Sequence, residues 1–111
     1  MGEYSIIKRE FAFLESEYGF KKSLKQKYGA YHFLTWTNDR KKIRVFYDHT
    51  IERMENPVWI QIYDLYTPGT IVDCDKYSSE FAIQSGSPKE RIHCAADWLR
   101  KAIENKTILI E

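Results

Sequence analysis

The fold is decided by residues 31–48, which read Tyr-His-Phe-Leu-Thr-Trp-Thr-Asn-Asp-Arg-Lys-Lys-Ile-Arg-Val-Phe-Tyr-Asp. Most of the first seven are aromatic or β-branched, which favours a β-strand over 31–37. Asn38-Asp39 is a turn signal, because both side chains readily hydrogen-bond to nearby backbone. The following residues alternate between two sides, with Ile43, Val45 and Tyr47 on one and Lys42, Arg44 and Phe46 on the other. The stretch therefore predicts two antiparallel strands joined by a short turn.

More strands are predicted on both sides of this pair. Residues 20–28 alternate weakly among lysines, and residues 58–66 form the most strongly apolar strand of the chain. A Pro-Gly turn then leaves room for a short return strand at 71–73, whereas residues 76–84 fit either one helical turn or an edge strand. Because short turns join consecutive strands, we expect an antiparallel meander of four to five strands.

Amphipathic helices are predicted at both ends of the chain. In residues 3–18 the apolar side chains recur on one helical face, and Gly19 follows as a stop signal. The run Ser-Pro-Lys-Glu at 87–90 starts a second helix, since it combines an N-cap, a proline at the first position and a capping box. Each helix has one apolar stripe, so each has to pack on the sheet or on the other helix.

These elements predict an α+β fold in a single domain spanning residues 1–111, with the meander flanked by an N-terminal and a C-terminal helix. We expect a cytoplasmic protein, because no apolar run approaches the roughly 20 residues of a membrane helix and the first residues lack the order of a secretion signal. Cys74 and Cys94 match no zinc or CxxC spacing and are expected to be free thiols.

The predicted sheet carries more aromatic side chains than one covered face needs. Strand 58–66 is apolar on both sides, and so is strand 31–37; the chain holds 3 Trp, 8 Tyr and 6 Phe. Two interpretations remain open. Either the second face is a recognition surface of partly solvent-exposed aromatic rings, or the sheet curls so that side chains of the chain itself bury both faces.

Charge is unevenly distributed, although the net charge is +1. Residues 21–44 contain eight cations and one acid, whereas residues 48–80 contain seven acids and two cations. Segments of opposite sign either steer a charged partner or are simply the solvated sides of the strands.

No motif in the sequence identifies a reaction. There is no Gly-x-Ser-x-Gly elbow, phosphate-binding glycine loop or His-Glu-x-x-His motif. His32 has no matched acid or nucleophile nearby in sequence and is expected to be a partly buried residue of its strand. His49 follows Asp48 on a predicted loop, and His93 shares a helical flank with Glu90 and Asp97 but lacks the second Glu-x-x-His motif that a two-metal site needs. Asp73-Cys74-Asp75 is expected to be an exposed acidic edge. We therefore predict a protein that is not an enzyme and that uses no cofactor or metal. An enzyme would require acids and a histidine to converge in a pocket.

Four segments give the chain its layout: Leu-Glu-Ser-Glu-Tyr-Gly-Phe at 14–20, Ile-Arg-Val-Phe-Tyr-Asp at 43–48, Val-Trp-Ile-Gln-Ile at 58–62 and Ala-Asp-Trp-Leu at 96–99. This layout resembles that of small bacterial immunity proteins of contact-dependent growth-inhibition and other polymorphic toxin systems, over most of the chain. The resemblance implies a cytoplasmic, non-catalytic protein that binds one cognate toxin domain, frequently a nuclease. Inhibitors of basic nucleases are commonly acidic overall, and this chain is not.

The predicted function is therefore occlusion of a toxin's active site, with the 48–80 segment supplying a local negative field. Acids would raise the association rate and set the register, and tyrosines would anchor the interface. The predicted partner-binding residues are Asp48, Glu52, Glu55, Tyr63, Asp64, Tyr66, Asp73, Asp75, Tyr77 and Glu80. The alternative is a nucleic-acid-binding module that uses the basic 21–44 segment, although the low net charge argues against it.

Overall fold

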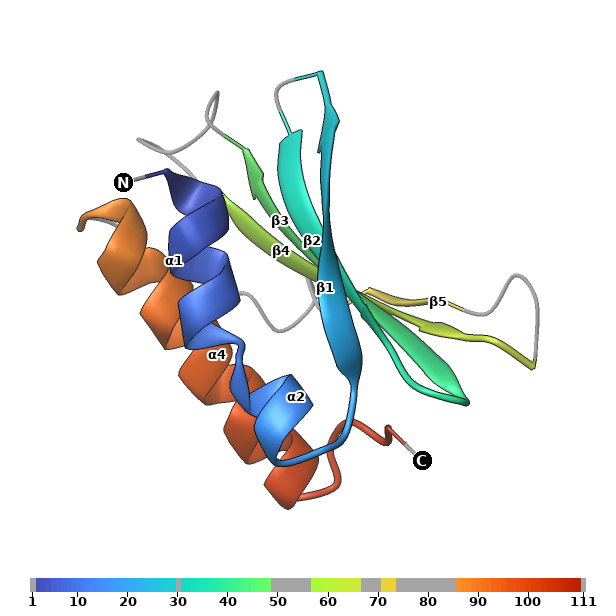
Figure 1. Cartoon of the computed structure of the whole chain (residues 1–111). Coiled ribbons are helices and arrows are strands. Elements are labelled where there is room, and N and C mark those ends of the chain that lie inside the picture. The colour runs from blue at the N-terminus through green and yellow to red at the C-terminus, as the bar shows by residue number, and fades with distance from the viewer. Residues whose placement is uncertain (1, 30, 49–56, 67–70, 74–85, 111) are drawn as a thin grey trace.

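The computed structural model describes residues 2–29, 31–48, 57–66, 71–73 and 86–110. It confirms the α+β class and the antiparallel meander between terminal helices (Figure 1). In chain order the elements are α1 (Glu3–Glu10), α2 (Phe13–Ser16), β1 (Lys21–Tyr28), β2 (Tyr31–Thr37), β3 (Lys41–Asp48), β4 (Val58–Asp64), β5 (Ile71–Asp73) and α4 (Pro88–Glu104).

The strands pair in the order β1-β2-β3-β4-β5, and each neighbouring pair is antiparallel. The turn between β2 and β3 is fixed by Asn38, whose Oδ1 accepts from the backbone amides of Arg40 at 2.8 Å and Lys41 at 2.6 Å. Such local side-chain hydrogen bonds are the reason that asparagine favours turns. The hairpin predicted from residues 31–48 is therefore correct in both its strands and its turn.

Helices α1 and α4 lie side by side against one face of the sheet and run in the same direction (Figure 1). Two ion pairs join the N-terminal helices to α4. His93 Nδ1 lies 2.6 Å from Glu10 Oε1, and Arg100 pairs with Glu17. Glu10 and Glu17 are separated along the chain by the same number of residues as His93 and Arg100, as expected for parallel helices.

The single helix predicted over residues 3–18 is interrupted at Phe11 and Ala12. Phe11 is fully buried and Phe13 is 7% exposed. On one continuous helix, side chains two positions apart point in nearly opposite directions. The interruption changes the helical phase, so that both rings and Leu14 reach the core. Gly19 follows with φ +70, the left-handed conformation expected of a residue that ends a helix.

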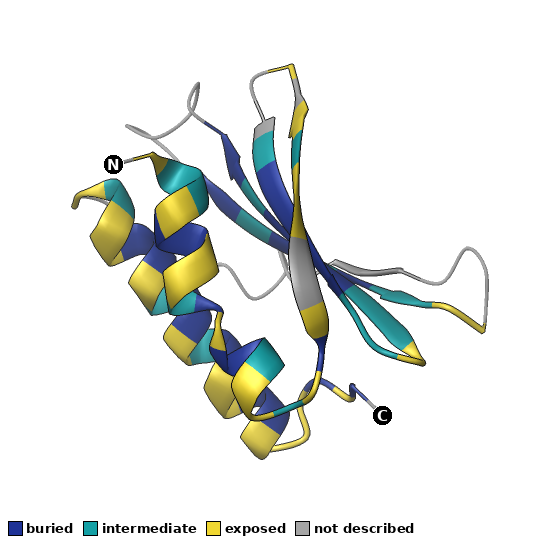
Figure 2. Cartoon of the chain, viewed as in Figure 1, coloured by how far each residue is buried: buried dark blue, intermediate teal, exposed yellow. Residues whose placement is uncertain are grey.

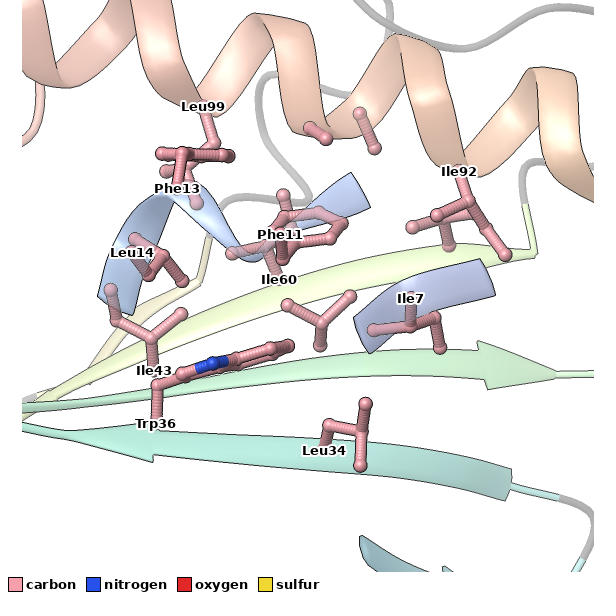
Figure 3. Close-up of a cluster of buried hydrophobic side chains, with 14 of the residues drawn as sticks. Ile7, Phe11, Phe13, Leu14, Leu34, Trp36, Ile43, Ile60, Ile92 and Leu99 are labelled. Carbon is pink, nitrogen blue, oxygen red and sulfur yellow. The ribbon is translucent and has the colours of Figure 1, made fainter. Parts of the chain in front are cut away.

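The core lies between the helices and the near face of the sheet (Figure 3). Trp36 of β2 lies beneath Phe11, with ring centroids 5.9 Å apart, and its indole Nε1 donates to Glu15 at 3.4 Å. The strands contribute to the same cluster the buried side chains Leu34, Ile43, Val45, Tyr47, Val58, Ile60 and Ile62.

The start of α4 matches its sequence signature. Ser87 accepts from the Glu90 amide at 3.2 Å, and Glu90 in turn accepts from the Ser87 amide at 3.3 Å. Pro88 occupies the first helical position. The buried face of α4 includes Ile92, Ala96, Leu99 and Ile103, and the outward faces of the helices are exposed (Figure 2). Among the described residues, no helix is both long and apolar enough to cross a lipid bilayer.

Candidate functional site

The sheet face turned away from α1 and α4 is the candidate site, and we call it the helix-free face. Directly paired residues of neighbouring strands share a face, so the register assigns its members. Its described side chains are Lys21, Leu24, Gln26, Phe33, Thr35, Thr37, Lys42, Arg44, Phe46, Asp48, Trp59, Gln61 and Tyr63.

An aromatic row crosses three strands on this face. Phe33 of β2 is in register with Phe46 of β3, which is in register with Trp59 of β4. The ring centroids are 4.8 Å and 6.5 Å apart. Phe33 is only 8% exposed, and the other two side chains are partly buried. The row is therefore a packed aromatic cluster in which Phe33 is nearly covered while Phe46 and Trp59 remain partly exposed.

Arg44 lies beside this row, held between two rings. Its guanidinium carbon is 5.6 Å from the ring centroid of Phe33 and 5.0 Å from that of Tyr63. Arg44 Nη1 donates to the Tyr63 hydroxyl at 3.3 Å, and that hydroxyl donates to Gln61 Oε1 at 2.9 Å. These contacts fix the orientation of the guanidinium before any ligand binds.

A second cation lies close to the ring of Tyr63. Lys42 Nζ is 5.3 Å from the centroid of the Tyr63 ring, and Lys42 is directly in register with that residue. Lys42 and Arg44 are two positions apart on β3, so both project from the same side of the strand. The helix-free face thus presents two neighbouring positive charges around one tyrosine.

On the opposite face, the neighbouring cation is neutralised. Lys41 Nζ lies 3.0 Å from Asp64 Oδ2, whereas Lys42 and Arg44 have no carboxylate oxygen within 4.0 Å among the described residues. Next to this ion pair, Tyr66 is 69% exposed, and the guanidinium of Arg40 lies 5.6 Å from its ring centroid. Three predicted site residues, Tyr63, Asp64 and Tyr66, therefore each lie beside a cation, but Tyr63 and Asp64 are on opposite faces of the sheet.

The described acids of the predicted surface lie apart. Asp48 is 5% exposed at one end of β3, where its amide donates to the carbonyl of Pro57 at 2.9 Å. Asp64 is in register with Lys41 at the other end of that strand. Asp73 lies on β5 in register with Gln61. Asp48 and Asp64 therefore do not form one negative surface.

The remaining predicted residues, Glu52, Glu55, Asp75, Tyr77 and Glu80, lie outside the described part of the chain, as do His49, Cys74 and the ambiguous stretch 76–84.

The basic 21–44 segment also divides between the two faces. Lys25 Nζ lies 4.5 Å from the ring centroid of Tyr4 in α1, on the helix side, and Lys41 faces Asp64 on that side too. On the helix-free side, Lys42 and Arg44 project from β3, and Lys21 of β1 is joined to them through the register of Thr37. The high linear density of cations is therefore not one continuous surface.

Two of the histidines lie beside glutamates. The His32 ring stacks on Tyr4 with centroids 4.8 Å apart, and its Nδ1 is 3.8 Å from Glu3 Oε2. His93 contacts Glu10 at a hollow of about 90 Å³ between α1 and α4. Within the described ranges, no group of three or more His, Cys, Asp or Glu side chains is placed to hold a metal ion.

Sequence reasoning missed Phe33, Lys42 and Arg44 as site residues. The available signal was the phase of β3: Lys42, Arg44 and Phe46 lie out of phase with the buried Ile43, Val45 and Tyr47, so they have to face the other side. Cross-strand register then adds Phe33 and Tyr63 to the same face. The comparisons with known proteins add nothing to this geometry, since no family model, no curated protein and no solved structure matches the chain.

Proposed function

We propose that the chain is a non-enzymatic binding protein that neutralises a toxin domain by covering its active site with the helix-free face. The observation that carries the proposal is Arg44, held between the rings of Phe33 and Tyr63 with no matching carboxylate among the described residues. Arginine and tyrosine are the residues that most often dominate binding energy at protein interfaces. A rigid sheet presents them without the entropic cost of ordering a loop.

The charge of this face points to an acidic surface on the partner. Lys42 and Arg44 are the charged side chains that the structure describes around Tyr63. Many nucleases hold divalent metal ions with clustered carboxylates, which form such an acidic surface at the active site. The cations of the helix-free face would neutralise those carboxylates, and the bound protein would exclude both the metal ion and the substrate from the active site.

The test is genetic and biochemical. The product of the neighbouring gene, expressed with a tag, should co-purify with this chain, and the chain should restore growth to cells in which that product is toxic. If the neighbouring product is not toxic and does not bind, the proposal fails.

Nucleic-acid binding is the second candidate, favoured by the pairing of cations with aromatic rings on one sheet face. Two observations weigh against it. Base stacking needs an open ring face, yet Phe33 is 8% exposed, and the ring of Tyr63 carries Lys42 and Arg44 within 5.3 Å of its centroid. Retention on single-stranded oligonucleotides at about 0.15 M salt, falling steeply as salt rises, would support this candidate over the first.

A further inference from the structure

The cations of the chain differ in whether a carboxylate accompanies them. Among the described residues, four of them lie within ion-pair distance of an acid: Arg9 with Glu10, Lys41 with Asp64, Arg100 with Glu17 and Lys101 with Asp97. Arg44 and Lys42 have no such partner among the described residues, although both lie on a structured strand in the middle of the sheet. Their contacts are with aromatic rings instead.

The surroundings of Arg44 leave its charge available and its orientation fixed. The guanidinium donates one hydrogen bond, from Nη1 to Tyr63, and its Nε is buried without a hydrogen-bond partner. Nη2 has no acceptor among the described residues. A guanidinium presents five N–H donors in a planar fork that matches a carboxylate. Because Nε is buried and one N–H of Nη1 is donated to Tyr63, the donors left for a ligand are those of Nη2 and the second N–H of Nη1.

Preorganisation strengthens such a site. Ordering a free arginine side chain on binding costs conformational entropy, and here the rings of Phe33 and Tyr63 have already restricted it. Tyr63 is itself held by its hydrogen bond to Gln61. The ligand therefore meets a guanidinium whose position the free protein has already set.

The choice of ligand follows from the shape and charge of the surroundings. Lys42 adds a second positive charge on the same side of the strand, so the ligand is anionic. Phe33, at 8% exposed, offers little open ring face for a base to stack on, which disfavours nucleic acid. A carboxylate on a protein segment can bind through the Arg44 guanidinium and the neighbouring charge of Lys42 alone.

We infer that Arg44 is a binding site for an aspartate or glutamate side chain of an acidic protein segment, with Lys42 supplying additional charge. The inference rests on the proposed function, because it names the chemistry that the toxin domain presents to the helix-free face. The carboxylate accepts from the free donors of the guanidinium, and such charge-assisted hydrogen bonds are shorter and stronger than neutral ones.

The test uses the isolated full-length chain and two probes of matched charge, a peptide of six glutamates and a single-stranded oligothymidylate. Side-chain NMR signals of Arg44 and amide signals of Gln61 and Tyr63 should shift as the peptide is added. Arg44→Gln should weaken peptide binding by about tenfold, the loss expected for a charge-assisted pair. Arg44→Lys keeps the positive charge but loses the planar guanidinium group. Its affinity for the peptide should therefore lie between those of the wild type and Arg44→Gln.

Arg9→Gln is the matched control, because it removes the same charge from an exposed helix position. It should leave peptide binding unchanged. Equal losses in Arg9→Gln and Arg44→Gln, shifts confined to other parts of the chain, or tighter binding of the oligothymidylate would each overturn the inference. If Arg44→Gln does not fold, Arg44→Lys and the wild-type shifts decide. If the chain rescues growth but the peptide does not bind at Arg44, the proposed function stands and the carboxylate site at Arg44 is wrong.

Discussion

Leu99 and Leu109 illustrate how burial sets the cost of a residue. Leu99 of α4 is fully buried in the core, whereas Leu109, in the segment after α4, is 65% exposed. Leu99→Ala should lower the free energy of unfolding by about 3 kcal/mol, because it removes apolar contacts and leaves a cavity. Leu109→Ala should change it by less than about 0.5 kcal/mol. Urea unfolding of both variants measures the difference, and equal effects would contradict the described core.

Tyr4 links stability to pH. Its hydroxyl donates to the Gln26 carbonyl, and burial raises the pKa of Tyr4 above its ordinary value of 10.0. The folded chain thus holds the phenolic proton more tightly than the unfolded chain, so the stabilisation is fully present below pH 10 and is lost as the pH rises through the raised value. At pH 7, Tyr4→Phe should be less stable than the wild type by about 1 kcal/mol.

The difference between these two proteins should shrink above pH 10, because only the wild type loses this proton. Deprotonation of lysines remote from Tyr4 affects both proteins alike, so the wild-type-minus-variant difference in unfolding free energy reports on Tyr4 and on Lys25, whose Nζ lies 4.5 Å from its ring centroid. A difference that stays constant or grows between pH 7 and strongly alkaline pH would be inconsistent with the described contacts.

At the scale of elements, the capping box of α4 makes a local prediction. Ser87→Ala removes the side chain that accepts from the Glu90 amide and should cost about 1 kcal/mol of stability. Ser5→Ala is the matched control, since Ser5 is exposed within α1 and alanine favours a helix interior. Thermal unfolding should therefore show a lower midpoint for Ser87→Ala alone. A loss of equal size in Ser5→Ala would point to a general effect of serine removal.

The elements that could be predicted from sequence are those with local causes. The start of α4 follows from Ser87, Pro88 and Glu90, and the β2–β3 turn follows from Asn38, because each hydrogen-bonds within a few residues. The interruption at Phe11 has no such local signal. It arises because the rings of Phe11 and Phe13, which contact each other beside Trp36, both have to be buried. Only the tertiary structure imposes that requirement.

At the scale of the whole molecule, charge along the chain translates poorly into charge on a surface. Residues 41, 42 and 44 are all cationic, yet Lys41 is paired with Asp64 on the helix side while Lys42 and Arg44 face the other way. Asp48 and Asp64 come from one acidic segment and lie at opposite ends of the sheet. Tyr63 could be predicted as an interface residue, but the sign of its charged neighbours depends on cross-strand register.

Association with the proposed toxin partner should therefore depend on salt in a definite direction. Because Lys42 and Arg44 attract an acidic surface, the association rate should fall as ionic strength rises, and Lys42→Gln should reduce both the rate and its salt dependence. Lys101→Gln removes an equal charge that is already paired with Asp97 on α4 and should leave the rate unchanged. Stopped-flow mixing at two salt concentrations measures both. A rate that does not change with salt would contradict the electrostatic assignment.

The most direct test is a footprint of the complex by NMR cross-saturation or hydrogen exchange, with the proposed partner, once it has been co-purified with this chain. We predict that the protected residues lie on the helix-free face and include Phe33, Arg44 and Tyr63, while the exposed sides of α1 and α4 stay unprotected. Protection centred on the outer surfaces of α1 and α4, with the helix-free face unchanged, would contradict the claim that this face of the sheet binds the partner.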